Sequence, residues 1–150
     1  MLRNAEKQDS IAIRTLVRSA NLNPFGLNWR RFVVAVNLSR HVIGCVQLKP
    51  HRDGSLELAS LVVKEEWRGS GIARALIEKI VENHDGCLYL MCRTDLGSFY
   101  EQFGFNQAAN QALPPFFRRV SKLADRLQQI TKKKEGVLIM CRDCGELGLT

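Results

Sequence analysis

The sequence lacks any long apolar run. None of its windows approaches the roughly 18 uninterrupted apolar residues that a membrane-spanning helix needs. The first ten residues, MLRNAEKQDS, carry charges where a signal peptide would have its apolar stretch. Internal repeats, low-complexity tracts and linkers rich in Ser, Gly or Pro are also missing. These absences argue against a membrane-bound or secreted protein, and we predict one cytoplasmic domain spanning residues 1–150.

Cysteine is scarce and odd in number, with five residues at positions 45, 87, 92, 141 and 144. A chain of this length buries about 68–70% of its surface on folding without disulfides. We therefore expect mostly reduced thiols that behave as small apolar residues. Cys141 and Cys144 have CxxC spacing, but no second Cys or His pair follows at a zinc-like distance. We favour incidental thiols over a metal or redox role, and we predict no bound metal.

The positive charge is concentrated in one segment. The net charge of the chain is +7, and residues 113–134 alone carry +6. Asp125 is the one acidic residue of that segment, against the basic residues Arg118, Arg119, Lys122, Arg126, Lys132, Lys133 and Lys134. The rest of the chain is nearly neutral, which disfavours nucleic-acid binding over the whole surface. Any anionic partner should meet this segment.

Strand and helix patterns alternate along the chain, which is typical of an α/β or mixed α+β layer fold. Asp9 is expected to cap the first helix. Strands are expected at residues 2–5, 32–36, 42–48, 56–63, 87–92 and 136–141, and helices at about 10–20, 72–83, 96–103 and 114–131. The tail to Thr150 is weakly patterned.

The most informative segment joins the strand at 56–63 to the helix that follows. Its turn holds Arg68-Gly69-Ser70-Gly71-Ile72-Ala73. Unpaired backbone N–H groups and the positive end of the helix dipole attract an anion there, and glycines allow a phosphate oxygen to approach closely. A nucleotide-binding P-loop would need Gly-Lys-Ser/Thr, which is absent, and a dinucleotide fingerprint would need Gly or Ala where Arg74 stands.

The pattern Arg-x-x-Gly-x-Ala between strand and helix resembles the acetyl-coenzyme A site of the GNAT N-acetyltransferase superfamily. The resemblance extends over nearly the whole chain, through the segments LRNAEKQDSIAIRTLV, ELASLVV, EEWRGSGIA and LYLMCRTDLGSFYEQFGF. It implies the GNAT fold, a mixed and largely antiparallel sheet with helices on both faces. It also implies an acyltransferase that moves an acetyl group from acetyl-CoA to a primary amine.

The resemblance further implies which residues bind the coenzyme. Backbone N–H groups across Gly69, Ser70, Gly71, Ile72 and Ala73 would hold the pyrophosphate, with Arg68 adding positive charge. The pantetheine arm would enter a gap between the strands at 57–63 and 87–92. It would pair there with the backbone near Leu61, Val62 and Val63, and one N–H group would stabilise the oxyanion.

Two residues are candidates for proton transfer during direct attack of the amine on the thioester. Tyr100 stands where the family places a tyrosine that protonates the leaving thiolate; the alternative is a packed ring with an idle hydroxyl. Glu57 stands where several members carry a base; the alternative is an ordinary charged residue at an exposed strand end. The family's frequent Asn before the tyrosine helix is replaced here by Arg93-Thr94-Asp95.

The acceptor is the least determined part of the prediction. The segments ELASLVVKEEWRGSGIARALI and LYLMCRT resemble the acetyltransferase portion of N-acetylglutamate synthases, which implies an amino acid such as glutamate. Arg30, Arg31 and Arg93 are candidates to bind its carboxylate. The loop 23–29 either forms the acceptor pocket or covers the core, and His51 could border that pocket. The alternatives are a protein lysine or N-terminal acetyltransferase, and a non-catalytic module that binds CoA or an interaction partner.

The helix at about 114–131 is longer than the GNAT fold requires. Its apolar residues recur at helical spacing and form a seam of Phe116, Val120, Leu123, Leu127 and Ile130, with most basic residues off it. We favour packing of this seam on its own domain. The alternatives are a lid over the acceptor site, a homodimer contact or a surface for an acidic partner.

Overall fold

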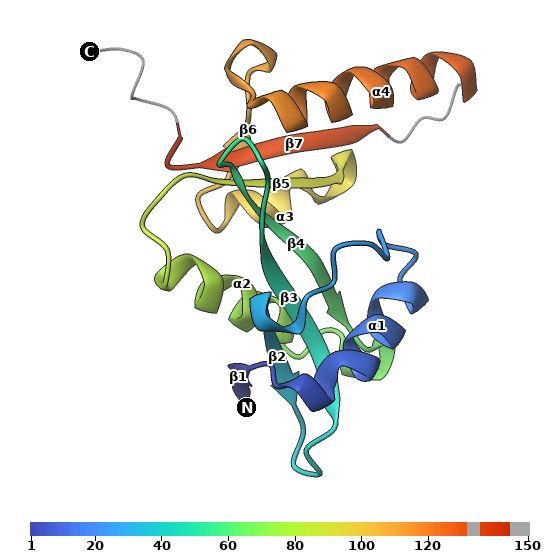
Figure 1. Cartoon of the computed structure of the whole chain (residues 1–150), viewed down its shortest axis with the longest axis vertical. Helices are drawn as coiled ribbons and strands as arrows, with labels where there is room; N and C mark the ends of the chain where they lie inside the picture. Colours follow the sequence, from blue (N-terminus) through green and yellow to red (C-terminus); the bar gives the residue numbers. More distant parts are fainter. Residues whose placement is uncertain (132–135, 145–150) are drawn as a thin grey trace. The chain divides into compact units, whose positions relative to one another are not determined.

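A computed structural model describes residues 1–131 and 136–144, which form two compact units. Unit 1 comprises Met1–Lys49 and Leu58–His84, and unit 2 comprises Pro50–Glu57 and Asp85–Thr150. The hydrogen-bonded strands follow the order β1-β2-β3-β4-β5-β7-β6 (Figure 1). This mixed sheet with its helices confirms the predicted fold class. Within the described ranges, no helix combines the length and apolar character needed to cross a membrane.

Unit 1 has a helix on each side of its strands, as Figure 1 shows. Its elements are β1 (Leu2–Asn4), α1 (Ser10–Ser19), β2 (Phe32–Val36), β3 (Val42–Pro50), most of β4 (Leu56–Val63) and α2 (Ile72–Glu82). β2 pairs antiparallel with both β1 and β3. Alternate side chains of β2 therefore face opposite helices. Phe32, Val34 and Val36 belong to the core that α1 completes with Ile13, Leu16 and Val17.

The second helix of unit 1 packs closely because a glycine lies beneath it. A Cβ atom on Gly44 of β3 would lie 3.2 Å from the Ile72 side chain and 3.3 Å from that of Leu76. Gly44 thus lets the first turns of α2 approach the sheet. This contact holds the residues at the start of α2 against a rigid strand.

The described part of unit 2 has three antiparallel strands and two α-helices. They are β5 (Leu88–Arg93), α3 (Gly97–Glu101), β6 (Asn106–Gln107), α4 (Pro115–Thr131) and β7 (Val137–Arg142). Tyr89 and Ile139 form a core with Phe117 of α4. Leu138, which precedes Ile139 in β7 and faces the other side of the sheet, lies against Gly97 of α3. The first residues of β4 join this unit through a parallel pairing of Glu57 with Tyr89.

One pair of cysteines departs from the expectation of mostly reduced thiols. Cys87 and Cys144 of unit 2 form a disulfide, whereas Cys92 and Cys141 of unit 2 and Cys45 of unit 1 are free, as expected. The register of β5 and β7 pairs Leu88 with Arg142, so the residues just beyond this pair meet. The sequence concealed the pairing because the two cysteines are 57 residues apart.

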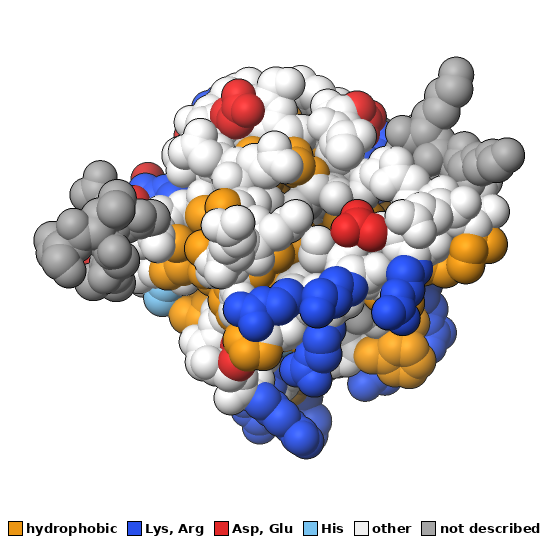
Figure 2. Space-filling model, turned by 90° about the horizontal axis from the view of Figure 1, so that it is seen from above, with side chains coloured by type: hydrophobic (Ala, Val, Ile, Leu, Met, Phe, Trp, Pro, Cys, Tyr) orange, Lys and Arg blue, Asp and Glu red, His pale blue; other side chains and the backbone are white. Residues whose placement is uncertain are grey.

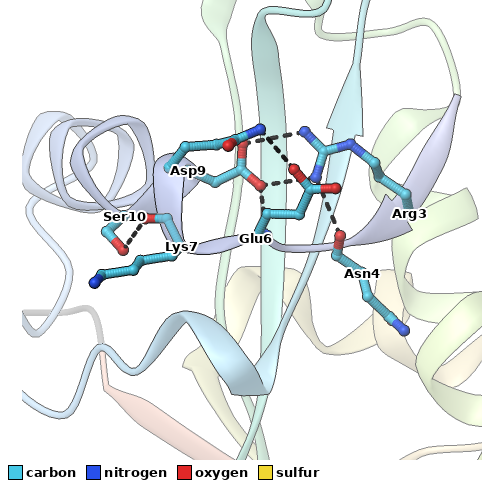
Figure 3. A network of polar contacts seen from close by, with 7 residues as sticks. Arg3, Asn4, Glu6, Lys7, Asp9 and Ser10 are labelled. Atoms are coloured by element: carbon cyan, nitrogen blue, oxygen red, sulfur yellow. Dashed lines mark hydrogen bonds and ion pairs between the residues drawn. The ribbon is translucent and has the colours of Figure 1, made fainter.

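The role predicted for Asp9 is corrected by the structure (Figure 3). Its carboxylate does not cap α1; it accepts a hydrogen bond from the Glu6 backbone N–H at 2.7 Å. It also accepts two from the Arg3 guanidinium, at 2.7 and 3.1 Å. The cause is a 3₁₀ turn, Lys7–Asp9, which precedes α1 and has its own capping box between Glu6 and Asp9.

The Asp9 network predicts acid-sensitive stability. The hydrogen bonds from Arg3 hold the pKa of Asp9 below its ordinary value, although burial opposes them. A carboxyl with a lowered folded pKa stabilises the fold above its ordinary pKa near 4, and this contribution is lost as the pH falls through the folded value. We expect Asp9→Asn to lower the free energy of unfolding at pH 7 by about 1.5–3 kcal/mol. In urea denaturation the deficit should shrink below about pH 3. Asp85→Asn, at an exposed position, is the matched control; equal stability of both variants at pH 7 would contradict the prediction.

Candidate active site

The turn before α2 has the shape of an anion-binding loop. A 3₁₀ turn, Glu65–Trp67, follows β4, and Gly69 and Gly71 then adopt φ values of +80° and +85°. A Cβ atom on either glycine would meet nothing within 4 Å. Left-handed backbone, not crowding, is therefore the reason for glycine at both positions. The space in front of the loop is open to a ligand.

The loop leaves the start of α2 available to that ligand. Gly71 is the N-cap and supplies no side-chain cap, so the first N–H groups of the helix have no side-chain acceptor from this position. Arg68 Nε donates to the Val63 carbonyl at 3.1 Å, and the Ser70 hydroxyl donates to the Trp67 carbonyl. These side chains brace the loop against itself. The helix dipole and backbone amides can then bind an anion such as a pyrophosphate.

Ser60, in the middle of β4, is a constrained residue that the sequence analysis missed. Its φ of +58° lies in the left-handed region, which is uncommon for a residue with a side chain. Gln47 Nε2 donates to its hydroxyl at 2.8 Å, and the Cys45 thiol contacts its carbonyl at 3.5 Å. The conformation breaks the regular course of β4 just before Leu61. The available signal was Gln47, the one amide in the apolar run VIGCVQL.

Glu57 is buried, so the structure contradicts an ordinary charged residue at an exposed strand end. Only 6% of the residue is accessible. Its Oε1 atom lies 2.8 Å from Nε2 of His51, which is equally enclosed. The His51 ring stacks on Phe116 of α4 with 3.7 Å between ring centroids. Both residues belong to unit 2, and a carboxylate held by an imidazole can accept or pass on a proton.

Tyr100 lies in α3 among aromatic side chains. It is 9% exposed and makes edge contacts with Phe99 and Phe105. Burial, with a smaller effect from Cys92, raises the pKa of its hydroxyl to about 12. Tyr100 therefore stays protonated at neutral pH and can donate a hydrogen bond. The raised pKa also makes it a weaker acid than an ordinary tyrosine.

Two of the arginines that were predicted to bind the acceptor, Arg93 and Arg30, contact residues that are close to them in the sequence. Arg93 forms an ion pair with Asp95 at 3.1 Å, and the Arg30 guanidinium lies 4.6 Å from the centre of the Trp29 ring. Phe25, in the loop 23–29, is largely exposed.

Across residues 1–131 and 136–144, no group of three or more His, Cys, Asp or Glu is arranged to hold a metal.

The seam predicted on α4 is only partly a packing face. Phe117, outside that seam, is fully buried, whereas Leu123, Leu127 and Ile130 are 59%, 53% and 78% exposed. Figure 2 views the molecule from the α4 side and shows Lys and Arg side chains in a band with hydrophobic side chains exposed beside them. The predicted basic residues Lys132, Lys133 and Lys134, and the tail 145–150, lie outside the described residues.

Comparison with known proteins identifies the class to which this fold and loop belong. The model of the GNAT acetyltransferase domain matches residues 28–107, which include the loop and Glu57 and Tyr100. The chain belongs to the GNAT acetyltransferase family. This family is the one that the resemblance of the motifs predicted. No curated protein sequence matches it.

Solved structures share the fold at low sequence identity. N-acetylglutamate synthase from Neisseria gonorrhoeae, complexed with CoA and N-acetyl-glutamate, has 18% identity and a TM-score of 0.70. The similarity covers 97% of this chain and 35% of the synthase, so this chain spans about a third of its length. Rv2747 from Mycobacterium tuberculosis, solved with CoA, has 18% identity and a TM-score of 0.72 over 95% of this chain and 98% of that one. ElaA from Escherichia coli has 14% identity and a TM-score of 0.67, over 95% and 98% respectively.

The geometry of the loop predicts that Gly71→Ala weakens CoA binding. Placing an L side chain in left-handed backbone costs about 1–2 kcal/mol, and the loop can escape this strain by changing shape. We expect the dissociation constant of CoA, measured by calorimetry, to rise about tenfold. Gly54→Ala is the matched control, because Gly54 has a φ of +88° with equally open surroundings but lies in another turn. Equal CoA affinities of the two variants would argue against a coenzyme site at this loop.

Proposed function

We propose that this enzyme acetylates the amino group of a small amino acid that carries an additional carboxylate, with glutamate as the first candidate. The observation that carries the proposal is the buried carboxylate of Glu57, which is available as a base in a chain of the GNAT family. The identity of the acceptor is supported by the fold shared with N-acetylglutamate synthase and by the segments ELASLVVKEEWRGSGIARALI and LYLMCRT.

In the proposed complex, the loop holds the coenzyme by its backbone. The N–H groups of Gly69 to Ala73 bind the pyrophosphate, and the positive charge of Arg68 adds to their attraction. The pantetheine arm pairs with the backbone near Leu61, Val62 and Val63, where one N–H group polarises the thioester carbonyl. The constrained backbone of Ser60 supports this assignment, since it alters the course of β4 directly before these residues.

The proposed reaction is a direct transfer. Glu57 takes a proton from the substrate ammonium, directly or through a water molecule, and the neutral amine attacks the thioester carbon. The tetrahedral intermediate collapses with breakage of the carbon–sulfur bond, and its nitrogen loses its second proton to solvent, from which Tyr100 is later reprotonated. Tyr100 donates a hydrogen bond to the departing thiolate and supplies its proton. With a pKa of about 12, Tyr100 is a weak proton donor, so stabilisation of the thiolate by that hydrogen bond is its main contribution.

Substitution of the two side chains tests the proposed mechanism. We expect Glu57→Gln to lower kcat by about 100-fold or more, which is the range for loss of a general base. Tyr100→Phe should also lower kcat, because it removes the hydroxyl and keeps the ring. Both variants should bind CoA as the wild type does in calorimetry. Glu101→Gln, at an exposed position of α3, is the control for the loss of a carboxylate. A wild-type kcat for Glu57→Gln would exclude Glu57 as the base.

A panel of acceptors tests the substrate class. Release of free thiol from acetyl-CoA should be fastest with L-glutamate when it is compared with neutral amino acids, L-lysine, spermidine and a lysine-containing peptide. If Arg30 or Arg31 binds the second carboxylate, its replacement by Met should raise KM for glutamate about tenfold, the effect of losing a hydrogen-bonded charge pair. KM for acetyl-CoA should stay constant. Faster turnover of the peptide would favour the protein acetyltransferase instead, and CoA binding without turnover of any acceptor would favour a non-catalytic module.

A further inference from the structure

His51 is the direct neighbour of the carboxylate on which the proposed function depends. The 2.8 Å contact joins His51 Nε2 to Glu57 Oε1, and both side chains are less than one-tenth exposed. A carboxylate has no proton to donate, so while Glu57 is ionised the proton of this bond lies on Nε2 of His51. The bond therefore sets both the orientation of Glu57 and the tautomer of His51.

The inserted helix α4 holds the His51 ring in place. Phe116 stacks on the ring at 3.7 Å with an interplanar angle of 16°, and Phe117 meets it edge-on at 5.5 Å. Phe117 is itself anchored, because it is fully buried and stacks on Tyr89 of β5 at 4.9 Å. The imidazole thus has an aromatic ring on its face and another at its edge, which leaves it little freedom to turn.

A second contact ties the turn that carries His51 to the same helix. Asp53 Oδ2 accepts a hydrogen bond from the Phe116 backbone N–H at 3.0 Å, in the first turn of α4. Asp53 Oδ1 accepts from the Ser55 hydroxyl at 2.5 Å, and these two bonds hold the pKa of Asp53 down at about 2. The negative charge of an ionised Asp53 also interacts favourably with the positive N-terminal end of the α4 dipole. The turn from Pro50 to Leu56 is therefore fastened at both His51 and Asp53.

We propose that His51 is a positioning residue for the general base. Its Nε2–H holds the Glu57 carboxylate in the orientation that accepts the proton of the substrate amine. Helix α4 fixes the orientation of the His51 ring through Phe116. This inference rests on the proposed role of Glu57. It gives α4 a role in the proposed site. Two acidic groups act on the His51 side chain: Glu57 contacts its Nε2 atom and Asp53 lies within electrostatic range. Helix α4 presents the rings of Phe116 and Phe117 to it.

The test compares variants of His51 that differ in the hydrogen-bond donor. The probe is the amine of the panel above that releases thiol fastest from acetyl-CoA. His51→Leu removes the donor and should lower kcat about tenfold, the effect of losing a hydrogen bond to a charged group, while KM for acetyl-CoA changes less than about twofold. His51→Gln retains an N–H donor and should recover most of the lost kcat. His41→Leu, in an exposed turn, is the matched control.

A double-mutant cycle separates positioning from a general effect on the fold. If His51 acts through Glu57, the variant His51→Leu/Glu57→Gln should be no slower than Glu57→Gln alone. Multiplied losses in the double variant would overturn the inference. Phe116→Leu should give a smaller loss of kcat, and that loss should vanish in the Glu57→Gln background.

The inference and the proposed function fail in different ways. Wild-type activity of Glu57→Gln would refute the base, and the inference with it. A large loss for Glu57→Gln together with wild-type activity of His51→Leu would refute the inference alone. Nitrogen-15 NMR of the imidazole gives a readout that needs no acceptor: the wild type should carry its His51 proton on Nε2. A ring protonated only on Nδ1 would contradict the contact, even in a folded and active enzyme.

Discussion

A carboxylate that is buried as deeply as that of Glu57 requires a hydrogen-bonding partner. Residues of unit 2 supply that partner and hold it in place. An ionised group without a partner would be strongly destabilising in such surroundings. His51 satisfies Glu57 at 2.8 Å. That contact in turn constrains the turn between β3 and β4, because His51 and Asp53 both reach the first turn of α4. Two aromatic residues of α4, Phe116 and Phe117, then pack against the imidazole.

The glycine loop before α2, which the proposed function assigns to the coenzyme, depends on a different constraint, the conformation of its backbone. Gly69 and Gly71 allow left-handed turns that bring the chain directly into α2, and Gly44 lets that helix lie close to the sheet. The left-handed backbone of Ser60 is likewise held by its neighbours: Gln47 donates a hydrogen bond to its hydroxyl, and the Cys45 thiol contacts its carbonyl. β3 therefore supports the start of α2 through Gly44 and the course of β4 through Cys45 and Gln47.

Local patterns made most of the secondary structure predictable. β2 and β4 have the predicted bounds, and α2 begins directly after the glycine loop, because period-two and period-3.6 patterns and glycine positions are properties of neighbouring residues. The apolar seam of α4 shows that helical spacing alone did not predict which face of the helix is buried. Helical spacing locates the apolar residues, but Phe117, one position from the predicted Phe116, became the buried anchor. The neighbouring surface of Tyr89 and Ile139 selects the face that packs, and it lies on strands distant in sequence.

The sequence by itself determined the family and the position of the glycine loop that the proposed function assigns to the coenzyme. These are encoded in contiguous residues whose spacing dictates a strand, a left-handed turn and a helix start. Only the tertiary structure decided that Glu57 is buried beside His51, that Asp9 bonds to Arg3 and Glu6 instead of capping α1, and that Cys87 meets Cys144. The Asp9 contacts follow from the 3₁₀ turn that precedes α1, which the helical pattern of α1 did not reveal. The other two depend on strand register or on a turn that packs against a remote helix, so the folded arrangement alone brings those residues together.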